Sequence, residues 1–269
     1  VWVENHPEWY TADADGNNPI VPIDNEGGAT DWTDVADLNY DNSEMRKQMI
    51  EDMKFWLTET NIDGFRCDVA SAVPLDFWEE AIPKLRSEKS LFMLAEADQP
   101  NLLKGKDLFD MAYGWERHHI FNQMANSDNA VALWNEVYKT DTDRYEQEDI
   151  LMNFVTNHDE NSWNGTVFER MGENDEAMFV LATTFQNCMP LIYGGQEAGL
   201  SKRLRFFEKD TISWKNTELI PFYTKMLALK HNNMALWNGL AGGKMKPIET
   251  GHPDEIYAFY REKDGNRVI

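Results

Sequence analysis

Short apolar runs alternate with longer amphipathic segments along most of the 269 residues of this chain. The short runs have the length of buried strands, and the longer segments repeat apolar residues every three or four positions, as helices do. Strands that alternate with helices of this length predict βα units with parallel pairing, and therefore an α/β fold. Five strands are predicted, at residues 62–68, 91–96, 107–111, 149–157 and 189–194.

The segments between these strands are predicted helices. In the first of them Met45, Met49 and Met53 recur at helical spacing, and Asn42 or Ser43 can cap its first turn. The remaining helices are predicted at 77–85, within 118–138 as one or two helices, at 177–188 and at 217–231.

The two ends of the chain differ in composition from the βα region between them. Residues 1–42 are rich in Asp, Asn, Gly and Pro and are predicted to be mostly loop. After Asn238, Gly-rich turns lead into an alternating strand at 256–261, which predicts the start of a separate β domain. The predicted organisation is a loop-rich segment 1–42, a βα region 43–237 and the beginning of a C-terminal β domain, 238–269.

Three of the predicted strands end in side chains that are capable of chemistry. The first ends on Asp68, the second on Glu96, and the fourth on Asn-His-Asp-Glu at 157–160. In a barrel of parallel strands, catalytic groups come from the carboxyl ends of several strands, so the pattern favours a TIM-type barrel. A doubly wound sheet is the alternative, but no glycine-rich phosphate loop follows any of these strands. Five strands cannot close a barrel by themselves.

The two strand-end carboxylates are expected to differ in charge. Side chains alternate along a strand, so Arg66 should lie on the same side as Asp68 and hold it ionised. Glu96 ends an apolar run, where burial would keep it protonated. One ionised and one protonated carboxylate form the pair used in glycoside hydrolysis. Taken singly, each motif has another interpretation. Arg66 and Asp68 could form a structural ion pair, and Glu96 could be a solvated loop residue. The tetrad at 157–160 could be a turn or a metal site.

Composition narrows the function classes. The net charge of −22, without any cluster of Lys and Arg, argues against nucleic acid and against anionic membranes as partners. No apolar run reaches the roughly 18 residues of a membrane span. Ten Trp suit a protein that binds sugars, although large aromatic side chains more often fill cores. Cys67 and Cys188 lie in apolar runs and are predicted to be buried free thiols. The cellular location stays undetermined.

Three segments resemble, in order and spacing, signature segments of the α-amylase family of glycoside hydrolases. They are Gly-Phe-Arg-Cys-Asp-Val-Ala at 64–70, Ala-Glu at 95–96 and Phe-Val-Thr-Asn-His-Asp at 154–159. They match the fourth, fifth and seventh strands of that family's (β/α)8 barrel. Residues 35–39 look like its motif near the end of the B domain, and 193–197 look like the segment after the eighth strand. The resemblance covers essentially the whole chain.

The family's first signature segment is missing from this sequence. The resemblance therefore implies a partial TIM (β/α)8 barrel that contains strands four to eight and lacks the first three. Residues 1–42 would be a remnant of the B domain, and 43–237 the C-terminal part of the catalytic barrel. Such a piece is expected to be inactive by itself, and the uncovered strand at 62–68 makes self-association an expectation.

The resemblance also implies roles for individual residues. Asp68 would be the nucleophile, Glu96 the acid/base, and Asp159 the third carboxylate, which binds sugar hydroxyls. Arg66 would orient Asp68, and His158 would hydrogen-bond the sugar. A sixth candidate, Trp163, could form a sugar platform, with core or lid packing as the alternative. The implied activity is retaining hydrolysis of α-glucosidic bonds in starch-like or malto-oligosaccharides, so an oligosaccharide or polysaccharide is the expected partner.

Departures from the family's sequence pattern, and the range of activities in the family, leave alternative functions open. Ser71 and Ala72 stand where many α-amylases carry a Lys-His pair that touches substrate and calcium. No metal site is therefore assigned, and calcium stays open as a ligand whose usual donors are largely absent from this sequence. Transglycosylases and glucosyl isomerases of the family use the same catalytic residues. Non-catalytic binding or transporter-associated relatives usually lose at least one of the three carboxylates, all of which are present here.

Overall fold

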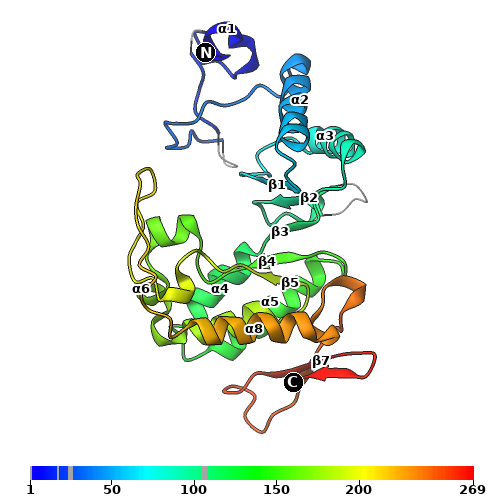
Figure 1. Ribbon diagram of the computed structural model, residues 1–269, viewed down its shortest axis with the longest axis vertical. Coiled ribbons are helices and arrows are strands. Elements are labelled where there is room, and N and C mark those ends of the chain that lie inside the picture. The colour runs from blue at the N-terminus through cyan, green and yellow to red at the C-terminus, as the bar shows by residue number, and fades with distance from the viewer. Residues whose placement is uncertain (1, 17, 24–26, 104–107) are drawn as a thin grey trace. The chain divides into compact units, whose positions relative to one another are not determined.

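The computed structural model describes residues 2–16, 18–23, 27–103 and 108–269. The chain forms two compact units, Val1–Asp110 and Met111–Ile269. Each unit combines parallel strands with covering helices, as the alternation along the sequence predicts (Figure 1).

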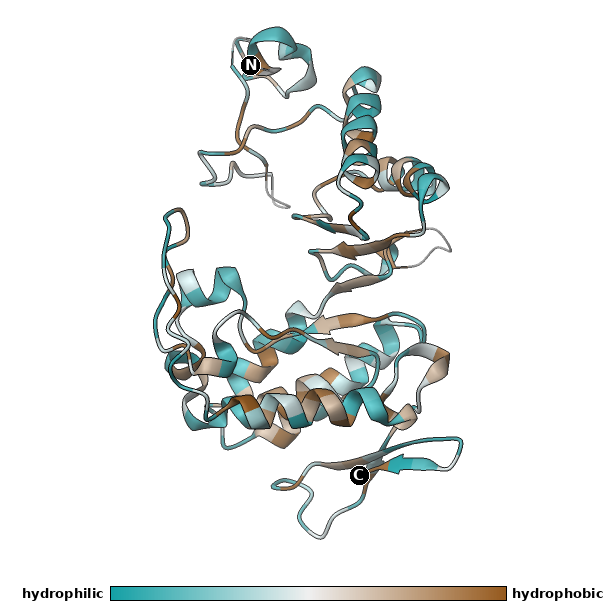
Figure 2. Ribbon diagram, viewed as in Figure 1, coloured by the Kyte–Doolittle hydropathy of each residue, from teal (hydrophilic) through white to brown (hydrophobic). Residues whose placement is uncertain are grey.

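The first unit is built around two parallel strands. It contains α1 (Trp2–Asn5), α2 (Ser43–Glu59), β1 (Gly64–Cys67), α3 (Leu75–Glu88) and β2 (Phe92–Ala95). Strand β1 pairs with β2 in a register that runs from Gly64 opposite Phe92 to Cys67 opposite Ala95. A Cβ atom at Gly64 would lie 1.8 Å from the Phe92 carbonyl oxygen, so only glycine permits this close pairing. Strand β2 is apolar along its length (Figure 2).

Helices α2 and α3 pack against each other within this unit. The predicted cap of α2 is confirmed, because the Asn42 side chain accepts hydrogen bonds of 3.0 Å from the backbone N–H groups of Glu44 and Met45. Helix α3 buries an apolar stripe that includes Phe77 and Leu85. The described residues among 2–42 are mostly irregular, as predicted, apart from α1 and a 3₁₀ turn at Pro7–Trp9.

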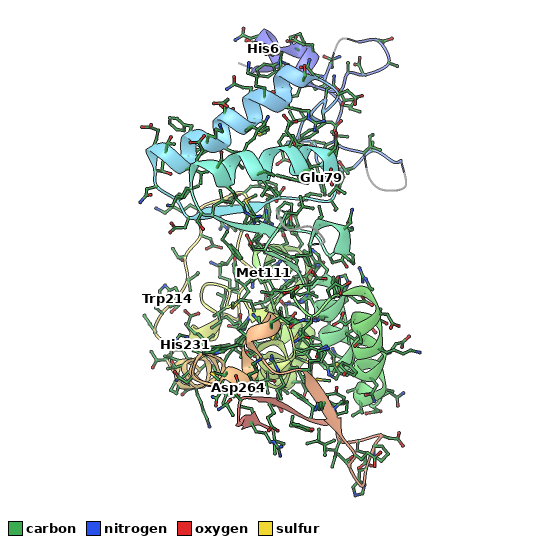
Figure 3. All side chains as sticks on the ribbon, turned by 90° about the vertical axis from the view of Figure 1, so that its right-hand side faces the viewer. His6, Glu79, Met111, Trp214, His231 and Asp264 are labelled. Atoms are coloured by element: carbon green, nitrogen blue, oxygen red, sulfur yellow. The ribbon has the colours of Figure 1, made fainter. Side chains whose placement is uncertain are left out.

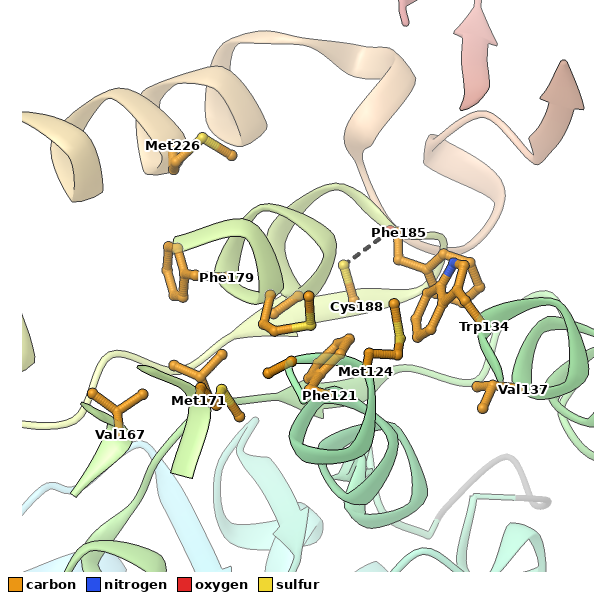
Figure 4. Packing of buried hydrophobic residues seen from close by; sticks show 14 of the residues in the cluster. Phe121, Met124, Trp134, Val137, Val167, Met171, Phe179, Phe185, Cys188 and Met226 are labelled. Carbon is orange, nitrogen blue, oxygen red and sulfur yellow. Dashed lines mark hydrogen bonds between the residues drawn. The ribbon is translucent and has the colours of Figure 1, made fainter. Parts of the chain in front are cut away.

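The second unit contains three further parallel strands and their helices. They are β3 (Met111–Tyr113), α4 (Trp115–Met124), α5 (Ala130–Arg144), β4 (Leu151–Asn153), α6 (Val167–Met171), α7 (Asp175–Thr184), β5 (Cys188–Pro190) and α8 (Ile220–Asn232). Strand β4 lies between β3 and β5 and pairs with both in parallel. The hydrophobic core of the second unit contains buried side chains that include Phe121, Trp134, Phe179 and Phe185 (Figure 4).

A small antiparallel sheet follows α8 at the C-terminal end. It consists of β6 (Met245–Ile248), β7 (Ala258–Lys263) and β8 (Asn266–Val268), with β7 in the middle. Buried Arg261 on β7 donates to the carbonyl oxygens of Gly243, Phe185 and Trp237. The predicted strand at 256–261 therefore corresponds to β7, and Arg261 fastens this sheet to the rest of the second unit. The predicted division at 42 and 237 stays a prediction.

Several predicted element boundaries are wrong. The strand predicted at 149–157 ends at Asn153, and the strand predicted at 189–194 ends at Pro190. The helix predicted at 177–188 ends at Thr184, because Phe185 adopts an extended conformation and Asn187 a left-handed one with a φ of 49°. Cys188 consequently opens strand β5. The strand predicted at 107–111 begins only at Met111 (Figure 3) and runs to Tyr113, while residue 107 lies outside the described residues.

Both cysteines are buried free thiols, as predicted. Burial raises the pKa of Cys67 to about 12, so this thiol stays protonated at neutral pH. No helix in the described ranges is long and apolar enough to cross a membrane.

Candidate active site

In the first unit, a single guanidinium bridges the two predicted catalytic carboxylates. Arg66 on β1 uses Nη1 to form an ion pair with Oδ1 of Asp68. Its Nη2 lies 2.6 Å from Oε1 of Glu96. Asp68 and Glu96 therefore contact the two terminal nitrogens of the same planar group. The ion pair also confirms that Arg66 and Asp68 lie on the same side of the strand.

Strand register explains why these residues meet. Cys67, the last residue of β1, is opposite Ala95, the last residue of β2, so Asp68 and Glu96 follow the two strands at the same level. The ladder continues one step further, since the Glu96 N–H donates to the Cys67 carbonyl oxygen at 3.0 Å. The two carboxylates are differently exposed, with 76% of the Asp68 side chain accessible and only 11% of that of Glu96.

Val69 is a contact of the site that the sequence did not reveal. Its backbone N–H donates to Oε2 of Glu96 at 2.8 Å. It does so from a φ of 40°, a conformation that a β-branched residue rarely adopts. Both oxygens of Glu96 are thus engaged, one by Arg66 and one by the backbone. No residue pattern signals this, because valine is not expected at positive φ.

The contacts of Glu96 act on its charge in opposite directions. Burial favours the protonated carboxyl, as the sequence led us to expect, whereas the Arg66 guanidinium and the Val69 amide favour the ionised form. The protonation expected from burial alone stays a prediction.

The second unit carries the other predicted residues, in the segment that follows β4. Asn157 shapes this turn, because its Oδ1 accepts hydrogen bonds from the N–H groups of Asp159 at 3.1 Å and Glu160 at 2.8 Å. His158 Nε2 lies 3.3 Å from Oδ2 of Asp159, and both side chains are partly exposed. The two residues assigned to sugar binding therefore contact each other.

Glu160, the last residue of the tetrad, is buried and starts a π-helix, η3 (Glu160–Asn164). Burial acts to raise the pKa of Glu160, but the hydrogen bond and charge of His118, with the charge of Arg170, lower it further than burial raises it. His118 Nε2 lies 3.1 Å from the Glu160 carboxylate. This contact lies at the start of the π-helix, directly after Asp159. Irregular helices of this kind are frequent at functional sites.

Trp163, on the same π-helix, is 57% exposed, which argues against the core-packing alternative. Its ring lies beside those of Phe206 and Phe207, with centroid separations of 5.1 and 6.1 Å. Both phenylalanines come from the long connection between β5 and α8. Neither was singled out by the sequence, in which the pair Phe-Phe has no distinguishing spacing.

Within the described parts of the chain, no group of three or more His, Cys, Asp and Glu side chains is placed to hold a metal ion. Ser71 and Ala72, at the position where the Lys-His pair was missing, line a small cavity with Gln99 and Asn101. This lining contains no carboxylate, and calcium stays open as a ligand.

Comparisons with known proteins agree with this arrangement. Residues 29–220 match the family model described as the alpha amylase catalytic domain. Alpha-amylase MalA of Haloarcula japonica is 26% identical over 244 residues, which cover 89% of this chain and 35% of that protein. The maltogenic alpha-amylase of Bacillus acidopullulyticus is 29% identical over 211 residues, 74% of this chain and 35% of that protein. The chain thus spans about a third of the length of these relatives. Among other similar proteins is a cyclomaltodextrin glucanotransferase of Niallia circulans, 24% identical over 77% of this chain and 30% of that protein.

Solved structures show the same fold. A noncanonic maltogenic alpha-amylase from Thermotoga neapolitana superimposes with a TM-score of 0.82 at 26% identity, over 98% of this chain and 58% of that one. An alpha-amylase from Lactobacillus plantarum gives a TM-score of 0.79 at 25% identity, over 99% of this chain and 63% of that one. The parallel strands β1 to β5 are accordingly part of a (β/α)8 barrel. With its family model matched over most of its length, this chain belongs to the α-amylase family.

Proposed function

We propose that this chain carries the nucleophile and the acid/base of a retaining α-glycosidase that cleaves α-glucosidic bonds in starch-like or malto-oligosaccharides. The observation that carries the proposal is the Arg66 guanidinium, which binds Asp68 and Glu96 at once. A retaining mechanism needs its two carboxyl groups only about 5–5.5 Å apart. Two carboxylates held on one guanidinium are close neighbours, which supports a retaining mechanism.

The proposed reaction has two steps. Asp68 attacks the anomeric carbon while Glu96 donates its proton to the glycosidic oxygen, so the glycosidic bond breaks and a covalent glycosyl ester forms on Asp68. Glu96, now ionised, takes a proton from water, whose oxygen attacks the anomeric carbon and releases Asp68. Two inversions retain the anomeric configuration. Arg66 stabilises the ionised states of both carboxylates, which alternate during the cycle.

His158 and Asp159 are assigned to the sugar that is cleaved. Their partly exposed imidazole and carboxylate contact each other at 3.3 Å and offer donors and acceptors for vicinal hydroxyls. Trp163 offers an exposed apolar ring surface in the same unit. The names of the maltogenic relatives favour an α-glucan as the substrate.

Transglycosylation is the second candidate function. It shares the glycosyl-enzyme step and differs only in the acceptor, which is a sugar hydroxyl in place of water. The similarity to a cyclomaltodextrin glucanotransferase supports transglycosylation as a candidate function. A non-catalytic binding role is less favoured, because Asp68, Glu96 and Asp159 are all present.

Leaving-group dependence tests the assignment of the acid in the full-length protein. Glu96→Gln should lose most activity on maltotriose but retain it on an aryl maltoside with a good leaving group, which needs no protonation. Asp68→Asn should lose activity on both substrates, because it cannot form the ester. Glu79→Gln, an exposed change on α3, is the matched control and should leave both rates unchanged. Equal loss on both substrates for Glu96→Gln would show that Glu96 is not the acid.

A further inference from the structure

Four aromatic rings adjoin one another in the second unit, starting from the predicted sugar-binding His158. Phe206 stacks on His158 with a centroid separation of 6.2 Å and an interplanar angle of 21°. Phe207 contacts Phe206 at 4.9 Å, and Trp163 contacts both phenylalanines. Despite these contacts, Trp163, Phe206 and Phe207 are 57, 42 and 72% exposed. Clustered exposed aromatic side chains are unfavourable in water and mark binding surfaces.

A cavity of about 280 Å³ adjoins this cluster. Its walls include the rings of His158, Tyr193 and Phe206 and the polar side chains of Glu208 and Asp210. Ligand sites combine apolar and aromatic walls with a few polar groups, and this volume is near the lower end of their roughly 300–1,000 Å³ range. The cavity is therefore suited to one sugar unit, whose ring has apolar C–H faces and whose rim carries hydroxyls.

The segment that carries the two phenylalanines is fastened to the π-helix. Asn161, which is 1% exposed, donates from Nδ2 to the Lys202 carbonyl oxygen at 3.2 Å. Its Oδ1 accepts from the Leu204 N–H at 2.8 Å. The amide thus pairs with the backbone on both sides of Arg203, directly before Phe206. Arg203 adds two hydrogen bonds of 3.0 Å to Glu169.

The far side of the same segment is closed by Asp210. Its Oδ1 forms an ion pair with Lys202 and accepts from the Thr211 N–H at 2.7 Å, and its Oδ2 accepts from the Arg205 N–H at 3.1 Å. The Lys202 hydrogen bond is the main reason why the pKa of Asp210 falls to about 2. Residues 202–211 therefore form a closed loop with Phe206 and Phe207 at its exposed turn. Rings that are held in place before binding lose little freedom when a sugar stacks on them.

We propose that Phe206 and Phe207, together with Trp163, form a stacking platform for the glucosyl units of an α-glucan chain next to the unit held by His158 and Asp159. The platform favours extended malto-oligosaccharides over disaccharides, because a longer chain adds contacts with Phe207 and Trp163 to those of the unit held beside His158 and Phe206. This inference rests on the proposed function for its ligand class. Its new elements are the two phenylalanines and the loop that Asn161 and Asp210 hold.

Binding of uncleavable ligands tests the platform without requiring turnover. The full-length protein is titrated with thio-linked maltohexaose and thio-linked maltose in a calorimeter. The double variant Phe206→Ala/Phe207→Ala should weaken maltohexaose binding about tenfold and maltose binding several times less, because maltose contacts fewer of these rings. A Phe206→Tyr/Phe207→Tyr variant keeps both rings and should restore the affinity for maltohexaose.

Trp214→Ala is the matched control. Trp214 lies on the same connection between β5 and α8 and is 56% exposed (Figure 3), but its ring is outside the cluster of His158, Trp163, Phe206 and Phe207. It should bind both ligands as the wild type does. If the double alanine variant folds poorly, as thermal unfolding would reveal, Phe207→Ala alone serves, because that ring is the most exposed.

The outcomes separate this inference from the proposed function. Unchanged maltohexaose affinity in the alanine variants, or equal weakening of both ligands, overturns the platform even if the wild type hydrolyses α-glucans. Selective loss of maltohexaose affinity supports the platform even if the wild type shows no hydrolysis, in which case only the proposed function fails. A wild type that binds neither ligand overturns the platform.

Discussion

The backbone N–H of Val69 donates a 2.8 Å hydrogen bond to the carboxylate of Glu96 from a left-handed conformation, with a φ of 40°. Positive φ costs a β-branched residue on the order of 1–3 kcal/mol, and it persists only where the surroundings enforce it. Here they do, because the next residue, Ala70, donates its N–H to the Glu96 carbonyl oxygen at 3.2 Å. Glu96 is therefore held by two successive amides that directly follow the proposed nucleophile, Asp68.

This geometry predicts an unusual response to glycine. Val69→Gly keeps the N–H and removes the conformational penalty, which offsets the lost side-chain contacts and the greater freedom of the unfolded chain. We expect the free energy of unfolding in urea to stay within about 1 kcal/mol of the wild type, with activity retained.

Val180→Gly is the control for this prediction. Val180 lies within helix α7 at ordinary helical dihedrals and is partly exposed. At this helical position, replacement by glycine should lower the free energy of unfolding by about 1 kcal/mol or more. A Val69→Gly variant that loses more stability than Val180→Gly would contradict the idea that Val69 is strained.

The pair of His118 and Glu160 predicts a pH-dependent contribution to stability. The folded-state pKa of Glu160 lies below its ordinary value of 4.5, because the contacts with His118 and Arg170 outweigh burial. A carboxylate whose pKa is lowered on folding stabilises the protein at any pH above its pKa in the unfolded chain. This stabilisation is lost as the pH falls through its pKa in the folded protein. Glu160→Gln should therefore lower the free energy of unfolding by about 1–3 kcal/mol near pH 7.

Urea unfolding of the full-length protein between pH 3 and pH 7 measures this difference. The difference in free energy of unfolding between the wild type and Glu160→Gln should be largest at neutral pH. It should shrink below about pH 4.5, because the wild type then loses the contribution of the ionised Glu160. Glu173→Gln, an exposed change before α7, should have no effect at any pH. A difference that is constant from pH 7 to pH 3 would mean that Glu160 acts through shape and not through charge.

Strand β1 predicts how the 269 residues behave when expressed alone. Among the described strands β1 pairs with β2 only, so β1 lies at the edge of its sheet. Such an edge is a template for pairing with another chain. We expect the isolated 269-residue chain to self-associate, as measured by light scattering over a range of concentrations.

A proline in β1 provides the contrast. The carbonyl groups of Asp63 and Cys67 bond to β2, so by alternation the backbone of Arg66 faces the other edge. Arg66→Pro would therefore remove a backbone donor from that edge and should reduce association if β1 mediates it, provided that circular dichroism shows that the fold is kept. A monodisperse monomer that unfolds cooperatively would instead show that the open edge is tolerated.

The order of the elements and the identity of the main carboxylates could be predicted from the residues alone. Periodicity located β1, β2 and the helix after Asn42, because each depends on residues that are near neighbours in the chain. The contact between Arg66 and Asp68 was likewise predictable, since alternation along a single strand places them on one side. The family, too, followed from the order of three short segments.

Contacts between residues that are distant in the chain could not be predicted, because they depend on how the elements pack. Arg66 also binds Glu96, 30 residues further along, because the register of β1 on β2 brings their ends level, and register is a property of two strands together. Phe206 reaches His158 because the buried amide of Asn161 pairs with a loop more than 40 residues away. No local pattern encodes such contacts, since they arise from the packing of segments whose separation along the chain carries no periodic signal.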